Sequence, residues 1–145
     1  MKTQNYSNHI RFYTPHHFVF YPIASLLFGV TTAFAFKSEE YNMIWAAIAA
    51  TIALIIWLSF LLRQHYALGN QNRIARLELR FRYYTITQKS FDTIEQQLSL
   101  SQLLALRFAP NDELVNLIER TLKENLTPDD IKKAVKNWLP DYMRL

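Results

Sequence analysis

Two long apolar runs without a charged residue dominate the N-terminal half of the chain. Residues 18–36 and 41–62 contain no Asp, Glu, Lys or Arg. Each run is about 20 residues long, the length that an α-helix needs to cross a hydrocarbon core of roughly 30 Å. Only residues 37–40 separate the two runs. The pattern predicts two transmembrane helices, at 18–36 and 41–62, that form a hairpin around an external loop at 37–40.

Small residues recur at helical spacing in both predicted spans. One row lies in each span: Ser25, Gly29 and Ala33 in the first, and Ala46, Ala50 and Ala53, with Ala49 beside them, in the second. Small side chains let helix backbones approach closely where no hydrophobic force drives helices together. The rows predict packing between the two spans, with contact to another protein as the alternative.

After the second span, the apolar positions change to a helical period within a predicted basic helix at 63–89. Ile74, Leu77, Phe81 and Tyr84, here called the apolar seam, follow an a/d-type spacing in this helix. Gly69 is the weakest point of the helix and favours a kink. We expect the apolar seam to pack on the chain's own C-terminal helices, and self-association through the seam is the alternative.

The remaining residues, 90–145, predict a small helical domain made of short capped helices. The expected helices are 91–98, one that Ser99 or Ser101 caps and that ends near Phe108, one that Asn111 caps and that ends near Asn125, and one from Thr127 to Pro140. The predicted fold class is therefore an all-α membrane protein: a transmembrane hairpin, a second span that continues into a cytoplasmic helix, and a small helical domain.

The net charge of +4 is concentrated beside the second span. Residues 63–89 carry Arg63, Arg73, Arg76, Arg80, Arg82 and Lys89 against the single acidic residue Glu78. Lys2 and Arg11 precede the first span, whereas the loop contains only Lys37. Because Lys and Arg accumulate on the cytoplasmic side of membrane proteins, both termini, including the segment 1–17, are expected in the cytoplasm. The first run is too long for the core of a signal peptide, and a second span follows it at once.

Histidine placement is the sharpest chemical feature. His9, His16, His17 and His65 all fall near one predicted membrane face. Imidazole groups bind zinc, copper or haem iron, so a metal or haem site is one hypothesis. Interfacial anchoring is favoured, because residues 1–38 contain no carboxylate that could orient a ligating ring. No cofactor is expected, and the lack of Cys excludes thiolate sites and disulfides.

Six segments carry a resemblance to a known family. They are residues 8–11, 15–18, 71–78, 104–109, 131–138 and 140–142. In these segments the chain resembles a bacterial family of uncharacterised two-span membrane proteins with a domain of unknown function, and the resemblance covers nearly the whole chain. It implies a location in the bacterial inner membrane, and it implies no activity.

No segment predicts a catalytic constellation, so we expect a non-enzymatic inner-membrane adaptor or accessory subunit that presents its cytoplasmic domain to a protein partner. Candidate contacts with a partner or with lipid headgroups are Arg73, Arg76, Arg80, Arg82, Lys132, Lys133 and Lys136. The alternatives are a metal- or haem-binding membrane protein that uses the four histidines, and a protein that self-associates through the apolar seam.

The expected partners are the lipid bilayer and a membrane or cytoplasmic protein, within a larger complex or a homo-oligomer. Contact with nucleic acid or a ribosome is the weakest hypothesis, because few exposed aromatic residues accompany the arginines.

Overall fold

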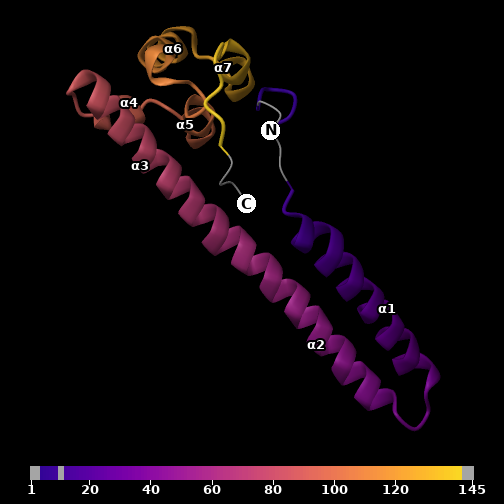
Figure 1. Ribbon diagram of the computed structural model, residues 1–145. Coiled ribbons are helices and arrows are strands. Elements are labelled where there is room, and N and C mark those ends of the chain that lie inside the picture. The colour runs from indigo at the N-terminus through magenta and orange to yellow at the C-terminus, as the bar shows by residue number, and fades with distance from the viewer. Residues whose placement is uncertain (1–3, 10–11, 142–145) are drawn as a thin grey trace. The chain divides into compact units, whose positions relative to one another are not determined.

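The computed structural model of the chain describes residues 4–9 and 12–141 (Figure 1). These residues form helices joined by irregular segments, and no strand occurs among them. The predicted all-α class is confirmed. The chain divides into two compact units, of which one is formed by residues 12–69 and the other joins residues 4–9 to residues 70–141. The first is called the apolar unit and the second the helical domain.

Two long apolar helices make up the apolar unit (Figure 1). The first begins with a π-helical stretch, η1 at Pro15–Phe20, and continues as α1 at Tyr21–Lys37. The second is α2 at Asn42–Leu61, which is followed by the π-helical stretch η2 at Leu62–Ala67. Both helices are long and apolar enough to cross a membrane.

Helices α1 and α2 pack against each other. The rings of Phe34 and Trp45 stack with their centroids 4.9 Å apart. Elsewhere on the same two helical segments, His16 Nε2 lies 2.7 Å from Ser59 Oγ. The buried residues of α1 and α2 are Ala24, Thr31 and Ala49. Small side chains therefore do line this contact, as close helix packing requires.

The predicted row of small residues on α1 is not part of the contact. Ser25, Gly29 and Ala33 are exposed, and a Cβ atom on Gly29 would meet nothing within 4 Å. On α2, Ala49 is buried, whereas Ala50 of the predicted row is exposed. The prediction that the α1 row packs on the second span is wrong, because the contact face of α1 runs through neighbouring positions.

Helix α3, at Leu68–Thr87, follows η2 without a break, so that residues from Asn42 to Thr87 are helical throughout. This extent agrees with the helix predicted at 63–89. The π-helical winding ends at Ala67, two residues before the predicted weak point at Gly69. The helix ends at Thr87, because the next residue, Gln88, has a positive φ of 56° that breaks the helical path.

Four short helices complete the helical domain: α4 at Asp92–Glu95, α5 at Leu100–Leu106, α6 at Asn111–Glu124 and α7 at Pro128–Ala134. Two predicted caps are confirmed. Ser99 and Gln102 form a capping box at the start of α5. At the start of α7, Thr127 Oγ1 accepts a hydrogen bond from the Asp130 backbone N–H. Asn125 ends α6 in the left-handed conformation, with a φ of 49°.

Two predictions about the short helices are wrong: the length of the first and the N-cap residue of the third. Helix α4 covers only part of the predicted helix 91–98. Helix α6 has Pro110 as its N-cap, so Asn111 is its first helical residue. The Asn111 side chain does not cap the helix, because its Oδ1 accepts a hydrogen bond from Arg82 Nε at 2.9 Å.

The last helix is also shorter than predicted. Helix α7 ends at Ala134 and not at Pro140. The Glu113 carboxylate accepts hydrogen bonds from the backbone N–H groups of Lys136, at 2.9 Å, and of Asn137, at 3.0 Å. These N–H groups would point at carbonyls one turn back if the helix continued. A tertiary contact thus replaces the last predicted turns.

The core of the helical domain gathers apolar side chains from α3, α5, α6 and α7 and from the segments between them. Its most deeply buried members are Leu79, Ala105, Leu106, Phe108, Ala109, Leu114, Ile118 and Ile131. Leu114, Leu117 and Ile118 of α6 lie within this core, and the partly buried Leu122 packs against it, at the spacing of one apolar helix face.

Residues 4–9 pack on the C-terminal part of the helical domain. The His9 ring lies 5.9 Å from the Phe108 ring and 5.7 Å from the Trp138 ring, centroid to centroid. The Asp141 backbone N–H donates a hydrogen bond of 2.7 Å to Gln4 Oε1. Sequence patterning does not predict this contact, because the segment has no amphipathic period. The contact joins residues 4–9 to residues near the C-terminal side of the helical domain, within one compact unit.

Candidate functional site on helix α3

Helix α3 has two apolar faces. Ala75, Leu79 and Tyr83 are buried against the helical domain. The apolar seam is exposed instead: the exposed fractions of Ile74, Leu77, Phe81 and Tyr84 are 66%, 67%, 69% and 53%. The expectation that the seam packs on the C-terminal helices is therefore wrong. The buried row and the apolar seam both have helical spacing. The buried row begins with Ala75, which is smaller than Ile74 of the seam and lets α3 approach its neighbours more closely.

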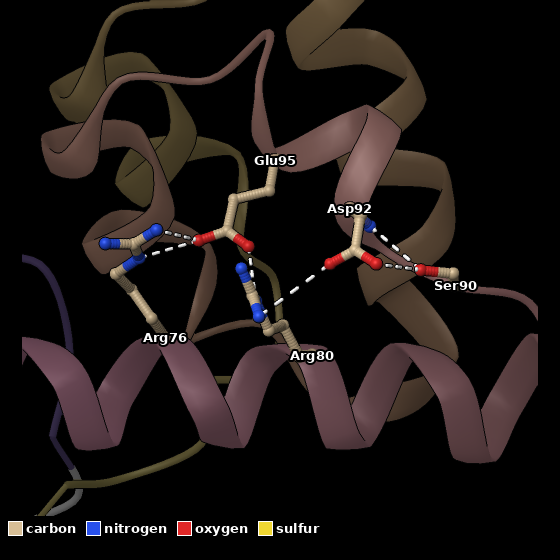
Figure 2. Close-up of polar contacts among 5 residues, drawn as sticks. All are labelled: Arg76, Arg80, Ser90, Asp92 and Glu95. Atoms are coloured by element: carbon tan, nitrogen blue, oxygen red, sulfur yellow. Dashed lines mark hydrogen bonds and ion pairs between the residues drawn. The ribbon is translucent and has the colours of Figure 1, made fainter.

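Two arginines of α3 hold a buried carboxylate between them (Figure 2). Arg76 Nε donates to Glu95 Oε1 at 2.6 Å, and Arg80 Nε donates to Glu95 Oε2. Glu95, in α4, is only 6% exposed, whereas both arginines are about half exposed. A carboxylate in this position needs its partners, because an unpaired buried charge is strongly destabilising. The arginine–carboxylate contacts therefore attach α4 to α3.

A second carboxylate extends the same cluster (Figure 2). Arg80 Nη1 lies 3.7 Å from Asp92 Oδ1 at the exposed edge of α4. Asp92 is oriented by Ser90, whose Oγ donates to Asp92 Oδ2 at 2.7 Å and accepts from the Asp92 backbone N–H at 3.2 Å. The outer pair is solvated and contributes little to stability compared with the inner contacts to Glu95.

Arg82 binds backbone carbonyls of the loop between α5 and α6. Its Nη1 donates to the Arg107 carbonyl oxygen at 3.1 Å, and its Nη2 donates to the Ala109 carbonyl oxygen. Burial lowers the pKa of the Arg82 guanidinium, and the nearby Glu78 carboxylate opposes this effect. Arg82 forms no ion pair with Glu78 among the described residues, because its guanidinium donates to the loop carbonyls.

Arg73 and Glu78 are exposed, and neither forms an ion pair within the described part of the chain. Arg73 lines a hollow of about 240 Å³ together with Arg76, Leu77 and Arg80. Of the four arginines predicted to meet a partner or a headgroup, three are thus occupied by the chain's own oxygen atoms. Among the described residues, the Arg73 guanidinium forms no ion pair with the chain's own carboxylates.

The three lysines predicted as a second contact surface do not share one helical face. Lys132 Nζ lies 3.5 Å from Asp129 Oδ1, and the side chain is half-buried. Lys133 is exposed, and its Nζ lies 5.4 Å from the centroid of the Tyr6 ring. Lys136 follows the end of α7 and is exposed. The three lysines are therefore basic groups with separate surroundings and do not form one contact surface.

The histidines predicted as metal ligands serve separate local contacts. His9 Nδ1 lies 2.6 Å from the Tyr6 carbonyl oxygen in the helical domain, and His17 Nδ1 lies 3.1 Å from the Tyr13 carbonyl oxygen in the apolar unit. His16 contacts Ser59, and His65 is exposed in η2. Among the described residues, no group of three or more His, Cys, Asp or Glu side chains could hold a metal ion.

Sequence reasoning identified the arginine row but missed its carboxylate partner. The signal was present: Asp92 and Glu95 lie three residues apart in the first short helix after α3, so both can face a row of arginines. The position of Glu113 in the first turn of α6 indicates only a favourable charge there. Its contacts with two backbone N–H groups cannot be inferred from spacing.

Over the described residues the protein is all-helical, with two long apolar helices and a helical domain that exposes the apolar seam and Arg73. The chain belongs to a family of unknown function (DUF6526), whose family model matches residues 1–145. A comparison with curated proteins and a comparison with solved structures found no match.

Proposed function

We propose that the protein is a non-enzymatic adaptor or accessory subunit, anchored in the bacterial inner membrane by α1 and α2, that presents its helical domain to a protein partner in the cytoplasm. The observation that carries this proposal is the division of the chain into two units. The apolar unit has largely exposed hydrophobic side chains, whereas the helical domain has its own core.

The exposed side chains of α1 and α2 support membrane anchoring. Phe36, Met43 and Leu26 have exposed fractions of 87%, 78% and 68%. Keeping such surface in water costs about 25 cal/mol per Å² of apolar area, a cost that lipid removes. Residues 18–36 and 41–62 carry no Asp, Glu, Lys, Arg or His side chain that could serve a proton or ion pathway. The helices are therefore better suited to an anchor than to transport.

The composition of the helical domain supports a hairpin. Residues 4–9 precede α1 and residues 70–141 follow α2, yet they belong to one compact unit. A chain that crosses a membrane twice returns to its starting side, whereas a single crossing would separate these segments. The arginines of α3 favour the cytoplasm for that side. Lys2 and Arg11, which also entered the predicted orientation, lie outside the described residues.

The adaptor role is supported by how the domain uses its charged groups. Glu95 and Glu113 satisfy arginine and backbone donors and thus serve the fold. Within the described part of the chain, the apolar seam and Arg73 are exposed and Arg73 forms no ion pair, so both are open to contacts from outside the chain, whether with another protein or with a second copy. An exposed apolar stripe of this length is typical of an interaction surface.

The adaptor proposal is tested by crosslinking with a lysine-reactive reagent in membranes, mild detergent extraction and mass spectrometry. We expect a second protein linked to Lys132, Lys133 or Lys136 on the helical domain, and no such link from Lys37 in the predicted external loop. If the lysines of the domain link only within the chain or to other copies of it, the adaptor proposal is contradicted.

A further inference from the structure

The apolar seam is a continuous exposed stripe on one side of α3. Its four residues are spaced by three, four and three positions, which places them at a, d, a and d of two successive heptads. The opposite side of α3 is occupied by the chain's own core through Leu79 and Tyr83. Arg82 and the contacts to Glu95 fix the rotation of α3 about its axis. The seam therefore cannot turn inward and needs a partner from outside the chain.

The residue types in the seam favour a pair of parallel helices. Ile74 occupies an a position and Leu77 a d position, and β-branched Ile at a with Leu at d favours a parallel two-stranded coiled coil. Phe81 and Tyr84 continue the stripe in the next heptad.

The charges beside the seam indicate that the second helix is another copy of α3. Arg73 occupies a g position and Glu78 the following e position. In a parallel, in-register pair, a g residue faces the following e residue of the partner, so Arg73 and Glu78 would form two symmetric ion pairs. Both residues are exposed and form no ion pair among the described residues. In an antiparallel pair, g residues face each other, and Arg73 would meet Arg80 with the same charge.

We propose that the apolar seam binds the apolar seam of a second copy of this chain, as a parallel coiled coil over residues 74–84. This proposal rests on the proposed membrane anchor. Two heptads are too short for a stable coiled coil between free chains. Anchored copies in one membrane share the direction of α3, and their restriction to a plane raises the effective concentration of one seam near another.

Residues 1–145 contain no Cys, which permits a direct test with single cysteines introduced into the whole chain. Leu77→Cys places a thiol at a d position of the seam. Asn72→Cys places one on the same helix at an f position, away from the seam. Isolated membranes are treated with a short bismaleimide crosslinker, and dimers are quantified by denaturing electrophoresis. We expect about tenfold more dimer from Leu77→Cys than from Asn72→Cys. Equal dimer from both variants would overturn the proposal.

Charge reversal tests the register. Added to Leu77→Cys, Arg73→Glu or Glu78→Arg alone places like charges opposite each other and should lower the dimer about fivefold. The double reversal Arg73→Glu/Glu78→Arg restores opposite charges and should restore the dimer. A different protein or a lipid surface on the seam would leave the double variant as impaired as the single variants, and that result would also overturn the proposal.

Carbonate extraction of the same membranes separates this proposal from the proposed anchor. Release of the chain into the soluble fraction contradicts the anchor. A chain that stays in the membrane but gives no preferential dimer from Leu77→Cys contradicts the seam proposal alone.

Discussion

At the scale of single residues, Glu95 shows how a surface row of arginines becomes part of a fold. Its carboxylate receives hydrogen bonds from Arg76 and Arg80 while it is almost completely buried. Both arginines remain about half exposed, so solvent weakens the electrostatic attraction. If Glu95 lost its charge, the principal effect would be that its buried side chain no longer offers a charged acceptor to the two neighbouring arginines.

Replacement of Glu95 tests this role. We expect Glu95→Gln to lower the free energy of unfolding of the helical domain by about 1–3 kcal/mol, because two arginines lose a charged acceptor. The matched control Glu119→Gln, at an exposed position of α6, should change it by less than about 0.5 kcal/mol. Urea unfolding of the detergent-solubilised chain, followed by Trp138 fluorescence in a Trp45→Phe/Trp57→Phe background, measures both. Equal effects from the two variants would contradict the role of Glu95.

Local residue chemistry was predictable where a side chain acts on its own helix. Ser99, one of the two predicted caps of its helix, and the predicted cap Thr127 do cap the helices that follow them. Asn111 has the same intrinsic preference, but Arg82 takes its side-chain oxygen. The difference arises because Arg82 comes from an element 29 residues earlier in the chain, which local sequence rules do not include.

At the scale of elements, the number and approximate extent of the long helices were predictable, and their contact faces were not. Apolar length and helical period follow from composition. Apart from Tyr21 and Lys37 at its two ends, every position of α1 is apolar or small, so several faces are equally able to pack. The choice of Ala24 and Thr31 over Gly29 depends on the partner helix. The same limit explains why the wrong face of α3 was expected to be buried.

Neighbouring alanines on α2 test the observed contact. Ala49 is buried against α1, and Ala50 is exposed. Ala49→Leu should destabilise the packing of α1 on α2 by about 1–3 kcal/mol, because added methylene groups overfill a close contact. Ala50→Leu adds the same volume on an exposed side and should have little effect. Thermal unfolding of both variants in the same detergent, followed by circular dichroism, measures the difference. A larger loss from Ala50→Leu would mean that the contact face is assigned wrongly.

At the scale of the whole molecule, the chain consists of an apolar unit and a helical domain. Residues from before and from after the apolar unit both belong to that domain. The change in composition predicts a boundary near residue 63, whereas the two compact units divide between residues 69 and 70. The packing of residues 4–9 on Phe108 and Trp138 was not predictable, since a short segment without a period gives no sign of its partner. This contact bears on the proposed membrane anchor, because it places residues 4–9 in the same unit as the C-terminal part of the helical domain.

Accessibility of single cysteines in spheroplasts tests the central claim of a two-span anchor most directly. Ser7→Cys precedes α1, Glu40→Cys lies between α1 and α2, and Asn116→Cys lies on the exposed side of α6. With a membrane-impermeant maleimide, we expect Glu40→Cys to react in intact spheroplasts. Ser7→Cys and Asn116→Cys should react only after the membrane is permeabilised. Labelling of Ser7→Cys and Asn116→Cys from opposite sides, or of all three cysteines from one side, would contradict the anchor.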